Sequence, residues 1–142
     1  MKYRHAIRPQ VVVALLASVF LAGCAAGSGT KKQEALAERA QARWDFLAAR
    51  EPESAWQYLS RGAKDMTPKE QYIKETLVKP VMWTGARFLR EECASELTCK
   101  VYMLVDYKIR SHLSGVGIIE NSQVVVETWI NESETWYFLP SS

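Results

Sequence analysis

The spacing of apolar residues changes once along the chain, from helical before Pro80 to strand-like after it. Between positions 31 and 50, apolar side chains recur every three or four residues, as on one face of a helix: Leu36, Ala40, Trp44 and Leu47. Charged side chains, Arg43 among them, are expected on the other side of this helix. Two shorter helices are predicted, one from Pro52 to Gly62 and one from Thr67-Pro68 to Pro80.

Strict alternation marks positions 100–110, where every second residue is apolar: Val101, Met103, Val105, Tyr107 and Ile109. Positions 124–130 and 135–139 are expected to form a hairpin, and positions 81–93 an earlier, less regular strand. The turn-rich segment 111–122 has no assigned element. Helices followed by an antiparallel sheet of about four strands predict an α+β domain, with the helices packed on one face of the sheet.

The first 23 residues have the organisation of a secretory leader. Three basic residues, Lys2, Arg4 and Arg8, precede the 12 uncharged residues 11–22. That stretch is short for a membrane span, which needs about 20 apolar residues. A buried core helix is the alternative interpretation, but the flanking charges and the Gly23-Cys24 exit favour a leader.

The tetrapeptide Leu21-Ala22-Gly23-Cys24 resembles the lipobox of bacterial lipoproteins. The resemblance implies cleavage before Cys24 and acylation of that cysteine by chains such as palmitate, which anchor the protein to a membrane. Residues 24–30 would then form a short tether. An aspartate directly after the lipidated cysteine resembles an inner-membrane retention signal. This chain has Ala25 at that position, so the expected location is the periplasmic face of the outer membrane.

Processing at Cys24 would change the charge of the protein. Three of the 18 basic residues lie in the leader and none of the 16 acidic ones do. The mature chain therefore has 15 positive and 16 negative side chains, a net charge of −1. This balance excludes a strongly basic, nucleic-acid-binding face. Its 119 residues are enough for one domain, expected over residues 31–142.

Cys93 and Cys99 are the cysteines that lipidation would leave, in an oxidising compartment. Five residues separate them, between two strand-like segments, which favours a structural disulfide across a hairpin. A redox pair usually has two intervening residues, and a metal site needs more ligands than the mature chain's one histidine, His112, would add. Free or redox thiols are the alternative. No metal or cofactor is predicted.

Several aromatic segments look like those of small bacterial lipoproteins of the nuclear transport factor two-like (cystatin-like) superfamily. They are residues 42–47, 55–60, 127–130 and 136–137. The resemblance implies a cystatin-like roll, in which a curved sheet folds around a long helix. It also implies that the domain can have a cone-shaped pocket, which isomerases and dehydratases of the superfamily use with carboxylates, His or Tyr.

Tyr107 and Trp44 are the candidate pocket residues, although packing in the core explains both aromatic rings as well. Asp106 is expected on the wet face of its strand. The strand at 124–130 has two possible orientations. Its more uniformly apolar face (Val124, Val126, Thr128 and Ile130) is expected inward, which leaves Val125, Glu127 and Trp129 as an exposed partner surface. In the opposite orientation, Glu127 would be a desolvated carboxylate beside an indole, suited to general acid or base catalysis.

The first functional hypothesis is a non-enzymatic, lipid-anchored periplasmic domain that binds an envelope protein or forms a homodimer through its sheet. The alternatives are a pocket protein for a small apolar ligand and, less favoured, an isomerase- or dehydratase-like enzyme that uses Glu127 or Asp106.

Overall fold

The computed structural model describes residues 27–111, 115 and 117–141. The leader, Cys24 and His112 lie outside these residues, so the expected cleavage and lipidation stay predictions. Within the part described, no helix is long and apolar enough to cross a membrane.

The chain forms helices first and then a sheet, as the change of period predicts. The helices are α1 (Gly27–Ala48), α2 (Pro52–Trp56), α3 (Arg61–Met66) and α4 (Lys69–Leu77). The strands are β1 (Val81–Ser95), β2 (Thr98–Arg110), β3 (Ile118–Glu132) and β4 (Thr135–Leu139). They form one antiparallel sheet in the order β1-β2-β3-β4. The α+β class is therefore confirmed.

Three element boundaries lie four or more residues from the expected ones. Helix α1 begins at Gly27, inside the segment assigned to the tether. Gly62 lies within α3 rather than ending a helix, because the Ser60 hydroxyl accepts a hydrogen bond from the Ala63 amide and starts a new helix there. Strand β3 begins at Ile118, because its pairing with β2 continues to the Arg110–Ile118 pair.

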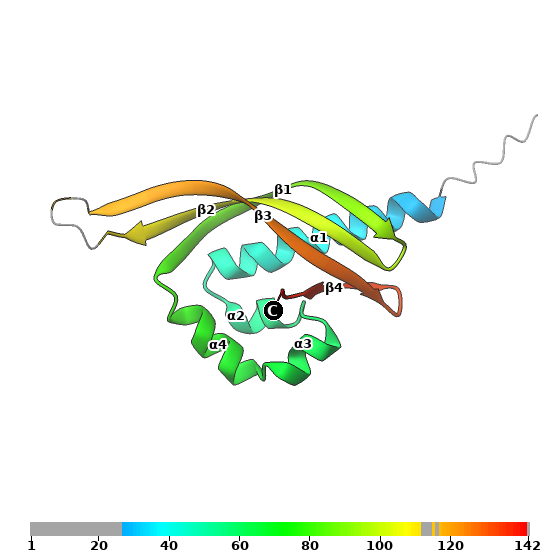
Figure 1. The fold of residues 1–142 in the computed structure, drawn as a ribbon, viewed down its shortest axis with the longest axis horizontal. Coiled ribbons are helices and arrows are strands. Elements are labelled where there is room, and N and C mark those ends of the chain that lie inside the picture. The colour runs from blue at the N-terminus through cyan, green and yellow to red at the C-terminus, as the bar shows by residue number, and fades with distance from the viewer. Residues whose placement is uncertain (1–26, 112–114, 116, 142) are drawn as a thin grey trace, which may run out of the picture.

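The sheet is curved, and α1 runs across its inner face while α2, α3 and α4 lie beyond that helix (Figure 1). Short strand β4 connects the sheet to these helices. The Phe138 amide donates to the Tyr58 carbonyl at 2.7 Å, and the Ser60 amide donates to the Phe138 carbonyl at 2.8 Å. The turn after α2 is thereby fixed beside the end of the sheet.

The core lies between α1 and the inner face of the sheet. Its residues include the four predicted on the α1 stripe, which are all buried, and Val101, Met103 and Val105 of β2. The predicted inward face of β2 is therefore confirmed at these three positions. Each contributes about 1.5–3 kcal/mol on full burial, so they anchor the central strand.

Two features of the sheet lie at its ends. At one end, the β2–β3 hairpin extends beyond α1 (Figure 1), and residues 118–124 of β3 are all exposed. At the other end, the directly paired Cys93 and Cys99 are joined by a disulfide next to the two-residue turn between β1 and β2. Cys99 is buried in the core, whereas Cys93 is exposed.

Candidate functional site

A cavity of about 480 Å³ lies between α1, the shorter helices and the inner face of the sheet. Apolar and aromatic side chains make up much of its wall: Trp44, Leu47, Leu59, Ala63, Tyr72, Trp83, Val125 and Phe138. The rings of Trp44 and Trp83 pack edge to face, with their centroids 5.9 Å apart. The volume lies within the range typical of small-molecule sites.

A buried ion pair forms another part of the wall. The Arg43 Nη1 atom donates to the Glu127 Oε1 atom at 2.6 Å, and the two side chains are only 7% and 3% exposed. The Trp129 indole donates to the other Glu127 oxygen at 3.0 Å. The guanidinium of Arg43 also lies over the Phe138 ring, 3.9 Å from its centroid. Both charged groups are therefore held in one arrangement.

The position of Arg43 on its helix and the pairing of Glu127 within the sheet explain how these two residues meet. Arg43 lies seven positions after Leu36 and four before Leu47, so it falls on the apolar stripe of α1. Glu127 is paired directly with Val101 of β2, and directly paired residues point to the same face of a sheet. Because Val101 faces the core, Glu127 does too.

Two N–H groups in the wall lack hydrogen-bond partners. Arg43 Nε and Trp44 Nε1 are both buried, and neither has an acceptor among the residues that the structure describes. A buried donor left without a partner costs about 1–3 kcal/mol. An oxygen acceptor brought within hydrogen-bond reach of these atoms, from a water molecule or a ligand, would remove that cost.

The ionisable groups that line the cavity balance in charge. Arg43 and Lys79 are positive, and Glu75 and Glu127 are negative. The Lys79 ammonium also lies 5.6 Å from the centroid of the Trp83 ring. A formal charge of zero gives no net attraction for either an anion or a cation.

The expected orientation of β3 is wrong. Val124 and Val126 are 53% and 51% exposed, whereas Glu127 and Trp129 are 4% and 0% exposed and Val125 packs against the core. Val125, Glu127 and Trp129 therefore do not form a partner surface. The more uniformly apolar face of β3 is therefore not the buried one. The other face is buried although it contains an acid, because Glu127 forms an ion pair with Arg43 and accepts a hydrogen bond from the Trp129 indole.

The other candidates are only partly brought together. Trp44 lines the cavity, but Tyr107 does not and instead pairs across the sheet with Trp83. Asp106 is half-buried, and one of its oxygens accepts a hydrogen bond from the Ser122 hydroxyl of the neighbouring strand. Asp106 is not among the residues that line the cavity.

The burial of Arg43 differs from the sequence-based expectation, which places this residue on the charged side of α1. The signal was present: an arginine at a position that continues the spacing of Leu36, Ala40 and Leu47 must be buried if that stripe is. A buried arginine requires an acid, so Glu127 on an otherwise apolar strand was its natural partner.

The hydrogen bonds of Glu127 limit what its carboxylate could do chemically. Both Glu127 oxygens already accept hydrogen bonds, one from Arg43 and one from the Trp129 indole. A substrate that gave a proton to Glu127 would have to share an oxygen with one of these donors or displace it. In the described part of the chain, no three His, Cys, Asp or Glu side chains gather where they could hold a metal ion.

Solved structures with a similar fold exist, although no family model and no curated protein matches the chain. One similar structure is a SEC-C motif containing protein from Rhodopseudomonas palustris, with a TM-score of 0.54 and 11% identity over 70% of this chain and 71% of the other. Another, from Psychrobacter arcticus, has a TM-score of 0.52 and 14% identity over 72% of this chain and 56% of the other. At these identities the likeness concerns the fold alone, and the chain shares the helix-on-sheet architecture of two SEC-C motif proteins.

Proposed function

We propose that this chain is a lipid-anchored binding protein of the bacterial cell envelope, whose cavity takes a small, uncharged and largely apolar ligand that carries a hydrogen-bond acceptor. The observation that supports this most directly is the pair of buried, unpartnered donors in the cavity wall, Arg43 Nε and Trp44 Nε1.

The lining of the cavity limits the ligand's chemistry. Aromatic and aliphatic side chains favour an apolar body, and the two donors favour an acceptor such as a carbonyl, ether or hydroxyl oxygen. The balanced charges give no preference for an ion. The ligand is therefore a neutral molecule with one oxygen-bearing end.

An enzymatic role has less support. Glu127 is committed to Arg43 and Trp129, and Asp106 is not part of the cavity wall. An isomerase- or dehydratase-like reaction would need a carboxylate free to accept a proton from the substrate.

The anchor is the second part of the proposal. It rests on the lipobox resemblance at Cys24, and Ala25 favours the periplasmic face of the outer membrane. The curved sheet around α1 supports a cystatin-like roll (Figure 1). Replacement of Cys24 by Ser should release the protein from the membrane fraction and remove the acyl mass from its N-terminus. Unchanged fractionation and mass would contradict anchoring.

An envelope protein or a second copy of the chain is a separate candidate partner. Such a partner would use the outer face of the sheet, where Val124 and Val126 are exposed and Leu104 is paired with Val124. Cross-linking of Val126→Cys in intact cells would detect it. The same cross-linker on Trp129→Cys should capture nothing, because Trp129 is buried.

The binding proposal is tested with matched small probes. The full chain, purified in dodecyl maltoside with 5-fluorotryptophan in place of tryptophan, is titrated with cyclohexanone, methylcyclohexane or cyclohexanecarboxylate. Cyclohexanone should shift the fluorine resonances of Trp44 and Trp83 saturably and more strongly than the other two probes. The hydrocarbon lacks an acceptor, and the acid is charged.

Neighbouring valines supply the control. Val125→Phe fills the cavity and should abolish the cyclohexanone shifts, whereas Val126→Phe adds the same bulk to the outer face and should leave them intact. Equal shifts with all three probes, or shifts that survive in Val125→Phe, would overturn the proposed site.

A further inference from the structure

A second hollow, of about 500 Å³, lies outside the cavity described above and shares no residue with it. Four elements or their adjoining turns contribute its lining. Arg39 and Phe46 come from α1, Ser54, Gln57 and Tyr58 from α2 and the turn after it, Lys64 from α3, and Tyr137 from β4. The set includes two cations and no acid.

The two cations lack carboxylate partners. Within the described residues, neither Arg39 nor Lys64 belongs to an ion pair. Each donates instead to a neutral backbone carbonyl: Arg39 Nε to Trp136 at 2.6 Å, and Lys64 Nζ to Gln57 at 2.9 Å. These bonds fix the direction of each side chain, but their acceptors are neutral, so neither positive charge is neutralised by an ion pair.

Aromatic rings hold the cations in place. The Arg39 guanidinium lies 4.8 Å from the centroid of Tyr58 and 5.1 Å from that of Tyr137. The Lys64 ammonium lies 5.0 Å from the ring of Trp56 and 5.5 Å from that of Tyr137. The Tyr137 ring therefore contacts both positive groups.

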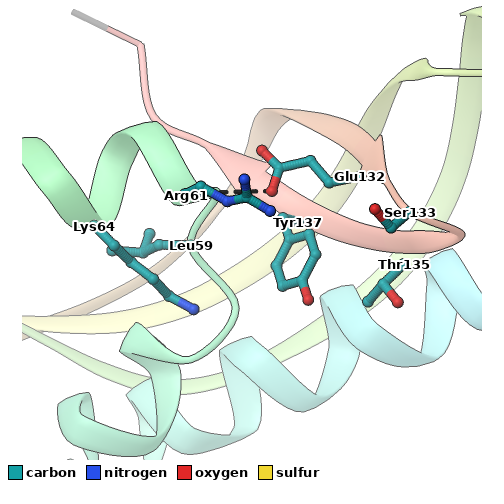
Figure 2. Close-up of a pocket in the computed structure, with 7 residues that line it drawn as sticks. All are labelled: Leu59, Arg61, Lys64, Glu132, Ser133, Thr135 and Tyr137. Atoms are coloured by element: carbon teal, nitrogen blue, oxygen red, sulfur yellow. Dashed lines mark hydrogen bonds between the residues drawn. The ribbon is translucent and has the colours of Figure 1, made fainter.

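Glu132 is the one acid among the residues that line this hollow and the neighbouring one. A neighbouring hollow of about 290 Å³ shares Lys64 and Tyr137 and is lined also by Arg61 and Glu132 (Figure 2). Glu132 accepts a hydrogen bond from the Arg61 amide at 3.4 Å, drawn as the dashed line in Figure 2.

The pKa of the Lys64 ammonium is lowered in this hollow. Burial first and the charge of Arg39 second lower the pKa of its ammonium, and Glu132 opposes them only in part. An anion bound between Arg39 and Lys64 would raise the pKa of the Lys64 ammonium instead.

We propose that Arg39 and Lys64, which both contact the ring of Tyr137, form a binding site for a phosphate monoester. Two positive charges without an ion-pair partner match a group that carries about −1.5 to −2 at neutral pH and offers three acceptor oxygens. The guanidinium fork of Arg39 suits two of those oxygens, and the Lys64 ammonium acts as a point charge on the third.

Two sources present this same chemistry to a membrane-anchored protein. One is a soluble phosphorylated metabolite, and the other is the headgroup of a phosphatidic acid-type lipid. A phosphodiester lipid offers one negative charge and fewer free oxygens, so it should bind more weakly.

The test uses the full chain in dodecyl maltoside and follows binding by calorimetry and by ³¹P NMR. The probes are glycerol 1-phosphate, inorganic phosphate, dioctanoyl phosphatidic acid and dioctanoyl phosphatidylglycerol. Saturable one-to-one binding of soluble phosphates assigns the site to a metabolite. Binding of phosphatidic acid alone assigns it to a lipid headgroup. Binding of none of the four, or equal binding of the phosphodiester, overturns the proposal.

Variants separate the site from general charge attraction. Lys64→Gln should weaken binding about tenfold or more, the effect of one charged hydrogen bond, and Lys64→Arg should restore most of it. Lys108→Gln removes the same charge from a surface pair with Glu120 and should change nothing. Unfolding temperatures of all three variants verify their folding. Equal losses in Lys64→Gln and Lys108→Gln would refute a specific site.

Discussion

The guanidinium of Arg43 and the carboxylate of Glu127 lie 2.6 Å apart in the core, although the two residues are 84 positions apart in the chain. This pair links the first helix to the third strand of the sheet and borders the proposed ligand cavity. Both charges lose their hydration on folding. The effect of each charge on the stability of the fold therefore depends on the presence of the other.

The first prediction concerns this dependence. Arg43→Met should destabilise the fold by about 3–5 kcal/mol, because it leaves a buried carboxylate with no cation. Glu127→Gln, which leaves a buried guanidinium, should also be costly. The double variant should be less destabilised than Arg43→Met alone. Denaturant unfolding of the four proteins measures the coupling, and strictly additive effects would show that the two charges act independently.

The second prediction concerns the Cys93–Cys99 disulfide. Replacement of both cysteines by serine should cost about 2 kcal/mol, because the bond closes a loop of seven residues. Single variants should differ: Cys99→Ser places a hydroxyl in the core, whereas Cys93→Ser changes an exposed position. Thermal unfolding under oxidising and reducing conditions checks both statements. Equal midpoints for the two single variants would disagree with the burial difference.

The third prediction concerns the turn between β3 and β4. Ser133 and Glu134 have φ values of 51° and 65°, which non-glycine residues rarely adopt. Glu134→Gly should therefore stabilise the protein by about 0.5–1 kcal/mol. Glu96→Gly in the β1–β2 turn is the control, since Glu96 does not have a positive φ, and it should give no gain. Chemical denaturation compares them, and stabilisation by Glu96→Gly alone would argue against this backbone explanation.

The fourth prediction concerns Glu91 of β1. Burial raises the pKa of its carboxyl above the ordinary value of 4.5, and its Oε2 atom has no hydrogen-bond partner among the described residues. A carboxyl with a raised folded-state pKa favours folding below its unfolded pKa, and that contribution is lost as the pH rises through the folded value. Glu91→Gln should therefore raise the unfolding temperature at neutral pH and make little difference below 4.5.

Exposed Glu96 supplies the comparison for this pH dependence. Glu96→Gln should leave the unfolding temperature almost unchanged across the same pH range. A gain for Glu91→Gln that is as large in acid as at neutrality would point to a cause other than ionisation.

The period of the apolar pattern was sufficient to predict the helices before the sheet and the inward face of β2. The central residues of β2, Val101, Met103 and Val105, alternate with more polar neighbours, so only one face of this strand could be buried. Strand β3 has apolar residues on both faces, and alternation cannot choose between them. The choice depends on which residue of β2 lies opposite, and on Arg43 from a distant helix.

The candidate site was harder to predict for the same reason. Trp44 was found because an aromatic residue on an apolar helix stripe must face inward, but the unpartnered nitrogen atoms depend on how the helices close over the sheet. The hollow around Arg39 and Lys64 needs four elements to meet, and no local spacing encodes that.

The β2–β3 hairpin that extends past α1 divides the sheet into two zones of different local stability. Amides of β2 near Met103, above the buried core, should exchange with solvent hydrogen only when the whole domain unfolds. Amides near Ile119, with no helix beneath them, can exchange through opening of the hairpin end alone. One continuous pair of strands therefore contains both the slowest and some of the fastest exchanging parts of the sheet.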